Sequence, residues 1–372
     1  MHHLKWLILT LMLAAGAALA DPSDQAAEAL AKGDYATALR ILQPLAQSGD
    51  APARYNLAAM YLRGQGVPKD DKQAMYWYLK AAELGHRSAQ FNLGLMYSQG
   101  LGTSKDDRQA VYWYRKAAEQ SHAEAQNNLG YMYDIGQGVA QDDRQAAQWY
   151  LKAARQGIAE AQYSLCVMSV EGRGVPKDDR QASRLCRLAA DRGLARAQYQ
   201  LALMYAGGQG VQHDDEQAIH WYRKAADQGL DIAQYNLGAM YAEIQGPTRD
   251  YSQAVLWYRK AADQGHAKAQ HNLGSMYALG QGVPKDEQQA IAWYRKAADQ
   301  GIAQAQLNMG VMYANGTGVP EDFQQGYFWL LLASASGDPA AIKYREMVKA
   351  TLTPAQRAAA QADARNWKPR QP

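Results

Sequence analysis

The sequence predicts an all-α solenoid in which antiparallel helix pairs stack one on the next. Eight consecutive blocks of 36 residues run from Ala51 to Asp338 without insertion or deletion. Seven of the blocks carry a tryptophan at the same position, which Leu185 takes in the remaining block. Glycines recur where the expected helices end. Repetition at this period is typical of chains in which each repeat buries its apolar face only against its neighbours.

The first helix of each block, helix A, is predicted from apolar and small residues at helical spacing. In residues 123–158 these are Ala125, Leu129, Met132 and Tyr133. The pair Gly136-x-Gly138 follows. Glycine readily adopts the left-handed backbone conformation with which many helices end, so we expect helix A to stop there.

The second helix, helix B, is predicted to begin at an aspartate that a glutamine follows three residues later. Both columns are complete: Asp70, Asp106, Asp142, Asp178, Asp214, Asp250, Asp286 and Asp322, with Gln73, Gln109, Gln145, Gln181, Gln217, Gln253, Gln289 and Gln325. Asp-x-x-Gln is a capping-box pattern. Each cap stabilises a helix by about 1 kcal/mol. We therefore interpret these aspartates as structural rather than catalytic.

The end of helix B is predicted from paired alanines followed by a glycine. Ser121 replaces that glycine in one block, where we expect slight backbone strain. In the turn that follows, His86, His122 and His266 share one column, and we interpret them as surface residues rather than metal ligands.

The two ends of the chain differ from the repeats. Residues 1–20 resemble a cleavable signal peptide, with Lys5, an apolar stretch and the pattern Ala18-Leu19-Ala20, and an uncleaved anchor is the alternative. Residues 21–50 are expected to form a degenerate first helix pair that caps the N-terminus, and residues 339–372 C-terminal capping helices and a tail. Loss of Lys5 lowers the formal net charge from +3 to +2, which gives no electrostatic indication of nucleic-acid binding.

The repeated motifs resemble the Sel-1-like repeat, a relative of the tetratricopeptide repeat. They read Ala-x-Ala-Gln-x-Asn-Leu-Gly-x-Met-Tyr, Gly-x-Gly-Val, Asp-x-x-Gln-Ala and Trp-Tyr-x-Lys-Ala-Ala-x-Gln-Gly. The resemblance covers residues 51–86, 87–122, 123–158, 159–194, 195–230, 231–266, 267–302 and 303–338. It implies a right-handed superhelical solenoid that serves as a protein-interaction scaffold. Secreted bacterial members of this family are adaptors, regulators of sensor proteins or parts of envelope assemblies.

Two cysteines depart from the repeat within one block. Cys166 replaces a helix A glycine, and Cys186 replaces the tyrosine that follows the tryptophan column. Cysteine-rich secreted relatives cross-link helix A to helix B at the columns of Gln162 and Ala190, and the two cysteines lie one turn nearer the hairpin. This resemblance predicts a disulfide, which an exported location permits and which would stabilise the fold by roughly 3 kcal/mol. Two buried free thiols are the alternative. A redox pair is disfavoured because no Cys-x-x-Cys motif is present.

The variable face of helix A is the predicted partner-binding groove. In tetratricopeptide relatives this face is concave, and aromatic rings beside amides suit an extended peptide. The candidate residues are Tyr55, Phe91, Tyr131, Tyr163, Tyr199, Tyr235, His271, Asn92, Asn128, Asn236 and Asn272. As alternatives, the rings pack between repeats while the amides bond to nearby backbone, or the tyrosines stack on sugars. The turn Ile244–Pro247 also departs from the repeat, and its shape is left open.

No catalytic constellation accompanies these features, and we expect neither enzyme activity, metal nor cofactor. The motifs Ser-x-x-Lys, Gly-x-Ser-x-Gly and His-Glu-x-x-His do not occur in the sequence. The favoured hypothesis is a periplasmic scaffold, not membrane-spanning and most simply a monomer, that binds a protein or peptide as an adaptor or regulator in the bacterial cell envelope. Secretion into the medium is the alternative location. The alternative functions are a glycan- or peptidoglycan-associated scaffold and, with less support, a β-lactam-binding or β-lactam-hydrolysing protein.

Overall fold

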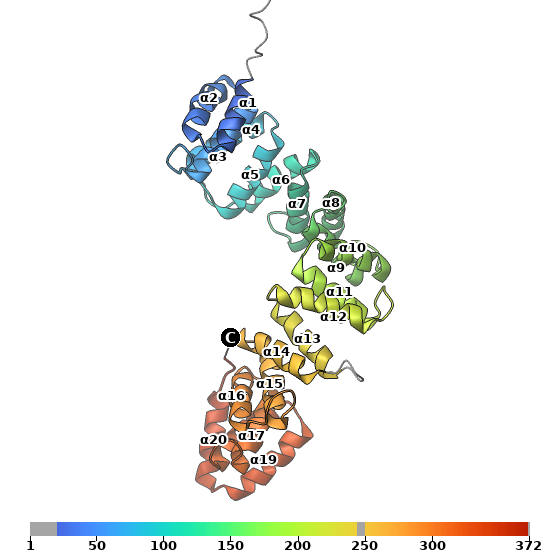
Figure 1. The fold of residues 1–372 in the computed structure, drawn as a ribbon. Helices are drawn as coiled ribbons and strands as arrows, with labels where there is room; N and C mark the ends of the chain where they lie inside the picture. Colours follow the sequence, from blue (N-terminus) through green and yellow to red (C-terminus); the bar gives the residue numbers. More distant parts are fainter. Residues whose placement is uncertain (1–20, 244–249, 371–372) are drawn as a thin grey trace, which may run out of the picture. The chain divides into compact units, whose positions relative to one another are not determined.

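The computed structural model describes residues 21–243 and 250–370, which form twenty helices and no β-strand (Figure 1). The all-α fold class predicted from the sequence is confirmed. The expected signal peptide and the turn at Ile244–Pro247 lie outside the described residues. Along the chain the structure divides into two compact units, Met1–Asp178 and Asp179–Pro372, which are described separately.

The first unit is a row of antiparallel helix pairs in sequence order. Helices α3, α5 and α7 are the A helices of their repeats and pack against the B helices α4, α6 and α8. Each B helix also packs against the A helix that follows it. The helices are α1 (Pro22–Ala31), α2 (Tyr35–Ser48), α3 (Ala51–Arg63), α4 (Asp71–Glu83), α5 (Arg87–Gln99), α6 (Asp107–Glu119), α7 (Ala123–Ile135), α8 (Asp143–Arg155) and α9 (Ala159–Glu171).

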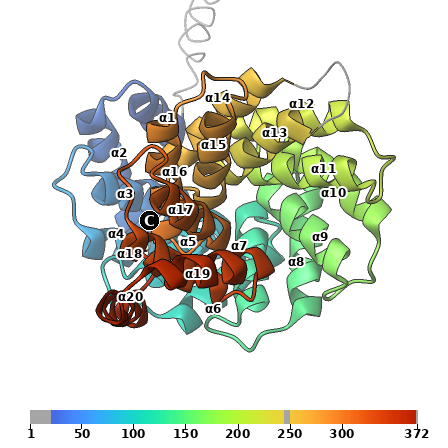
Figure 2. The same cartoon turned by 90° about the horizontal axis from the view of Figure 1, so that it is seen from below.

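The second unit continues the same pattern and ends in two further helices. Helices α19 and α20 both pack against α18 (Figure 2), and Val348 and Ala360 join Leu330 in one buried cluster. The helices are α10 (Asp179–Asp191), α11 (Ala195–Gly207), α12 (Asp215–Asp227), α13 (Asp231–Glu243), α14 (Tyr251–Asp263), α15 (Ala267–Leu279), α16 (Glu287–Asp299), α17 (Ala303–Asn315), α18 (Phe323–Ser334), α19 (Pro339–Thr351) and α20 (Pro354–Asn366).

A close contact between a glycine and a tyrosine sets the spacing inside several helix pairs. A Cβ atom added to Gly130 of α7 would lie 2.8 Å from the ring of Tyr150 in α8. Gly94 and Tyr114 make the same contact, as do Gly238 and Tyr258, and Gly274 and Tyr294. Glycine inside a helix costs roughly 0.5–1 kcal/mol relative to alanine. The glycine column is therefore explained by the ring that fills the space above it.

The predicted helix caps are present. In α8 the Oδ1 atom of Asp142 accepts hydrogen bonds from the backbone N–H groups of Arg144 and Gln145, at 2.9 and 3.0 Å. The matching aspartates cap α4, α6, α12, α14, α16 and α18. A complete reciprocal capping box is formed at Thr353 and Gln356 of α20. The aspartate columns are thus accounted for by helix starts.

The strain expected at Ser121 is also present. This serine has φ 61°, and among the described residues it is the one non-glycine residue with positive φ. Gly157 holds the same place one repeat later, with φ 91°. A side chain in the left-handed region costs of order 1–3 kcal/mol.

A chain of buried glutamines links neighbouring repeats. Gln126 in α7 donates from Nε2 to the carbonyl oxygen of Ala118 in α6 at 3.0 Å, and it accepts from Gln156, the C-cap of α8, at 2.8 Å. Gln90 and Gln120 repeat this arrangement, and Arg54 takes the role in α3 by donating to the Ala46 carbonyl. Three helices are joined through one side chain, which explains a polar column inside the apolar pattern.

Candidate binding surfaces

The predicted aromatic residues of helix A lie against the tyrosines of helix B. We call positions 5, 6 and 9 of each A helix, counted from the start of its repeat, the helix-A face. Its rings at position 5 are half-buried, and all of them except Tyr163, whose repeat has Cys186 in place of the tyrosine, lie over a buried tyrosine. The ring centroids of Tyr55 and Tyr78 are 5.6 Å apart, and those of Phe91 and Tyr114 are 6.0 Å apart. Tyr199, Tyr235 and His271 make the same contact with Tyr222, Tyr258 and Tyr294.

The histidine column also forms part of this surface, where its side chains are partly buried. His86, His122 and His266 are partly buried N-caps of α5, α7 and α15. Their rings stack on the position-5 rings of the preceding helix A: Tyr55 at 4.7 Å, Phe91 at 4.5 Å and Tyr235 at 4.7 Å. Apolar contact with these rings draws the imidazoles out of water.

The amide column connects neighbouring repeats. Asn236 donates from Nδ2 to the Tyr199 hydroxyl at 3.2 Å, one repeat earlier. Burial raises the pKa of Tyr78 to about 12, and a hydrogen bond with Asn92 acts in the opposite direction. Asn128 and Asn272 bond in the same way to Tyr114 and Tyr258. Part of each amide's hydrogen-bonding capacity is thus used within the fold.

Tyr131 and its surroundings form the most open part of the predicted groove. Its side chain is 51% exposed on α7, and Ile135 one turn further on is 48% exposed. Position 5 of this repeat holds Asn127, whose buried Oδ1 has no hydrogen-bond partner. Tyr163 is half-buried on α9. The helix-A face of this repeat therefore lacks the covering ring of its neighbours.

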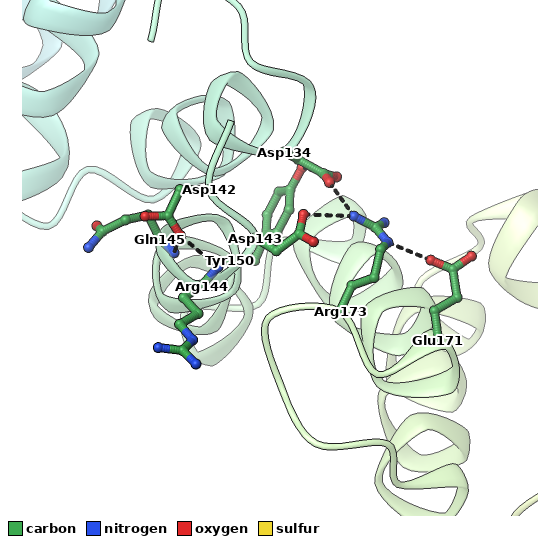
Figure 3. Close-up of polar contacts among 8 residues, drawn as sticks. All are labelled: Asp134, Asp142, Asp143, Arg144, Gln145, Tyr150, Glu171 and Arg173. Carbon is green, nitrogen blue, oxygen red and sulfur yellow. Dashed lines mark hydrogen bonds and ion pairs between the residues drawn. The ribbon is translucent and has the colours of Figure 1, made fainter. Parts of the chain in front are cut away.

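An ion-pair cluster around Arg173 includes Asp134, which lies three residues after Tyr131 on α7 (Figure 3). The Nη1 atom of Arg173 is 2.8 Å from Asp134 of α7 and 3.1 Å from Asp143 of α8, and its Nε is 2.7 Å from Glu171. Hydrogen bonds to Asp134 and Glu171 raise the pKa of this guanidinium. The cluster ties the hairpin after α9 back onto α7 and α8. Its carboxylates come from three different helices, so no local motif predicts it; the only signal is an arginine in the Gly-x-Gly hairpin.

A cavity of about 360 Å³ opens on the helix-A face in the second unit. Leu307 and Val311 of α17 give apolar lining, Tyr344 of α19 contributes an aromatic ring, and Asn308 contributes an amide. An ion pair of 2.8 Å between Lys285 and Glu287 belongs to the same lining. The full lining is Ala278, Lys285, Glu287, Tyr294, Leu307, Asn308, Val311, Met312, Thr317 and Tyr344. Neither Tyr344 nor the cavity was anticipated, because α19 lies beyond the repeat.

Two equivalent hollows lie on the B helices of the first unit, one repeat apart. Their volumes are about 390 and 530 Å³. Tyr76 lines the first and Tyr112 the second; these rings are 49% and 48% exposed and stand edge-on to Trp77 and Trp113. Lys80, which forms an ion pair with Glu83 at 3.3 Å, supplies polar groups. The repeat pattern singles out the tryptophan column but not the exposed tyrosines before it.

Both cysteines are disulfide-bonded and fully buried, and the chain holds no other cysteine, so a disulfide is present as predicted. Within residues 21–243 and 250–370, no cluster of three or more His, Cys, Asp or Glu side chains could hold a metal ion. Over the same residues, no helix is long and apolar enough to cross a membrane.

Stacked helix pairs with variable outer faces define the class: the chain is a helical-repeat protein. The model of the Sel1 repeat matches it eight times, at residues 51–86, 87–122, 123–158, 159–194, 195–230, 231–266, 267–302 and 303–338. The chain therefore belongs to the Sel1 repeat family, within the tetratricopeptide-like superfamily.

Solved structures of Sel1 repeat proteins resemble this chain over most of its length. A Sel1 repeat protein from Oxalobacter formigenes is 35% identical, with a TM-score of 0.64, over 83% of this chain and 90% of that one. A protective antigen of uropathogenic Escherichia coli strains, described as displaying an SLR fold, is 31% identical with a TM-score of 0.53, over 93% of this chain and 91% of that one. A search of curated proteins found no match.

Proposed function

We propose that this chain is an exported, non-catalytic scaffold that binds a protein or peptide on its helix-A face, as an adaptor or regulator in the bacterial cell envelope. The class is a Sel1 repeat scaffold, and proteins built from these repeats generally mediate protein–protein interaction. The buried disulfide is compatible with a periplasmic or extracellular location, because such bonds persist in oxidising compartments.

The cavity beside α17 and α19 carries the proposal. Its volume of about 360 Å³ lies within the range of small-ligand pockets and accommodates an apolar side chain of a partner. Leu307 and Val311 supply apolar contact, while Asn308 offers a polar group beside them. A mostly apolar hollow with a few polar groups is the usual form of an anchor site for a partner side chain.

The open surface at Tyr131 supports the same face in the first unit. Isolated exposed apolar residues are common in soluble proteins. Tyr131 and Ile135, however, stand one helical turn apart on α7, and Asp134 between them in the sequence pairs with Arg173, so apolar groups and charge share this part of the helix. This combination is typical of a peptide-binding surface rather than of a catalytic site.

In-cell photo-cross-linking tests the proposal. A photoreactive phenylalanine is placed at Tyr344, Tyr131 or, as a matched control on the B helices, Tyr76. The proposal expects one identified envelope partner to be captured from Tyr344 or Tyr131 but not from Tyr76. Binding of that purified partner should weaken at least tenfold in Tyr344→Ala with Val311→Ser. Unchanged affinity in this double variant would contradict the assignment of the cavity.

A glycan-associated scaffold is the second candidate, and the hollows at Tyr76 and Tyr112 favour it. Exposed aromatic rings can stack on a sugar, and the Lys and Glu side chains beside them can bond to its hydroxyls. Pull-down with purified peptidoglycan separates the two candidates. Retention that is lost in Tyr76→Ala with Tyr112→Ala, but kept in Tyr344→Ala, would favour the glycan function.

A further inference from the structure

The residue between one repeat and the next is the N-cap of the following helix A, and we call this place a joint. At three joints the residue is a histidine, whereas at three others it is an aliphatic residue. His86, His122 and His266 are the N-caps of α5, α7 and α15. Ile158, Leu194 and Ile302 hold this place at α9, α11 and α17, where no side chain caps the helix. The joints with an aliphatic residue cannot titrate, so they serve as internal controls for the joints with a histidine.

The cap bonds require neutral imidazoles. The Nδ1 atoms of His86, His122 and His266 accept the backbone N–H groups of Ala89, Ala125 and Ala269, at 3.2, 3.4 and 3.2 Å. A ring nitrogen accepts a hydrogen bond only while it carries no proton, so the ring proton lies on Nε2. A protonated ring would lose this bond and place a positive charge at the positive end of the helix dipole.

The same rings reach the helix-A face. Each histidine stacks on a position-5 ring with an interplanar angle of 21–23°. Tyr55, Phe91 and Tyr235 thus share their joints with the first turns of α5, α7 and α15. A change at the histidine affects the start of one helix A and the half-buried ring of the preceding helix A together.

The charged neighbours of the three histidines partly cancel, and burial is the largest influence. Desolvation lowers the pKa of each imidazole from its usual value of 6.5. Asp50 and Arg87 face His86 with opposing effects, Glu124 and Arg87 face His122, and Asp231 and Lys268 face His266. The unfolded chain therefore binds these protons at higher pH than the folded chain does. The contribution of these histidines to the free energy of unfolding is fully present above pH 6.5. It decreases as the pH falls through their lowered pKa values in the folded chain.

At His122 the protonated ring has a new partner in place. Glu124 Oε2 lies 3.2 Å from the same Nδ1 that accepts the Ala125 N–H group. One nitrogen cannot accept and donate at once. A proton taken from solvent onto Nδ1 therefore breaks the cap bond and forms a charged hydrogen bond to the carboxylate.

We propose that the joints at His86, His122 and His266 are proton-operated switches. The neutral ring accepts the cap hydrogen bond of helix A and stacks on the aromatic residue of the preceding helix A. In mild acid the ring is protonated, and both contacts weaken. The consequence for partner binding rests on the proposed function of the helix-A face. The switch itself does not, because it is a property of the free chain.

Hydrogen exchange of the full chain without a partner tests the switch. Protection of the amides of Ala89, Ala125 and Ala269 is measured at pH 7.5 and 5.0 and corrected for the intrinsic exchange rate. We expect protection to fall about fivefold at these amides, which corresponds to loss of one cap. The equivalent amides of Ala161 and Ala305, at the joints of Ile158 and Ile302, should show no such fall. Equal pH dependence at both sets of joints would overturn the proposal.

A matched variant separates protonation from other effects of acid. His86→Asn, His122→Asn and His266→Asn are combined, because asparagine is a favourable N-cap that does not titrate. Its protection at the three joints should be the same at both pH values. The imidazole resonances of the wild-type protein provide a second readout, and titration midpoints at or above 6.5 would overturn the proposal. Glu124→Gln should lower the midpoint of His122 alone.

Discussion

The repeats at residues 123–158 and 159–194 have the same sequence plan but differ where their two helices meet. The first places Gly130 beneath the ring of Tyr150, a contact with no room for a Cβ atom. The second has Cys166 and Cys186 in these two columns, and both are disulfide-bonded. A side chain larger than a methyl group occurs at the glycine column only where the large ring opposite is replaced. The difference shows that the residues of these two columns pack against each other.

Two repeats have an alanine in the glycine column although they keep the tyrosine opposite. Ala58 stands opposite Tyr78, and Ala202 holds the equivalent place opposite Tyr222. One methyl group is therefore accommodated beside the ring when the local packing adjusts. A sulfur atom is larger, and it occurs only where the tyrosine is absent.

Removal of the ring should have the largest effect. Tyr150 is 2% exposed, and its truncation in Tyr150→Ala leaves a cavity above Gly130. We expect the free energy of unfolding to fall by about 3–5 kcal/mol, measured by urea titration with circular dichroism. Tyr131→Ala, at an exposed ring of the same repeat, should change it by less than about 0.5 kcal/mol. Equal effects of the two substitutions would contradict the role of the Tyr150 ring in packing the two helices.

Loss of the disulfide should have the next largest effect. Cys166→Ala with Cys186→Ala removes a bridge across a loop of about twenty residues, and we expect a loss of about 3 kcal/mol. The wild-type protein should lose a similar amount in dithiothreitol, while this variant should be insensitive to it. Cys166→Gly with Cys186→Tyr restores the Gly–Tyr unit and should be more stable than the alanine pair. If the alanine pair proves the more stable, the contact between glycine and tyrosine does not stabilise this repeat.

The glutamine links should be equal in the two repeats. Gln126 donates to the Ala118 carbonyl at 3.0 Å, and Gln162 donates to the Ala154 carbonyl at 3.1 Å. Gln126→Ala and Gln162→Ala each leave a buried carbonyl without its donor, for which we expect a loss of about 1–3 kcal/mol in chemical denaturation. A clearly larger loss in one variant would show that the difference between the repeats extends to their joints.

The smallest effect concerns the turns before the two repeats. Ser121 precedes the first with φ 61°, and Gly157 precedes the second with φ 91°. Ser121→Gly should raise the free energy of unfolding by about 1 kcal/mol, because it relieves a left-handed side chain. Gly157→Ser should lower it by a similar amount. Thermal melting of the two variants tests the direction of both changes. A lower melting temperature of Ser121→Gly would contradict the backbone strain at Ser121.

Much of the fold could be predicted because its determinants are local. The aspartate of each helix B needs only backbone groups two and three residues ahead, so its column identifies the helix start directly. The candidate binding surfaces depend on residues that are distant in the sequence, so local patterns do not predict them. The carboxylates that hold Arg173 come from three helices, and the cavity at Leu307 needs Tyr344 from outside the repeats.

By itself the sequence determined the repeat length, the helix pairs, their caps and the strained serine. Each follows from contacts within one repeat, which the 36-residue period copies along the chain. Only the tertiary structure decided what the variable residues do: that the histidines cap helices and stack on rings, that the amides bond to neighbouring tyrosines, and where hollows open. These properties depend on distances between side chains of different helices, which no spacing along the sequence specifies.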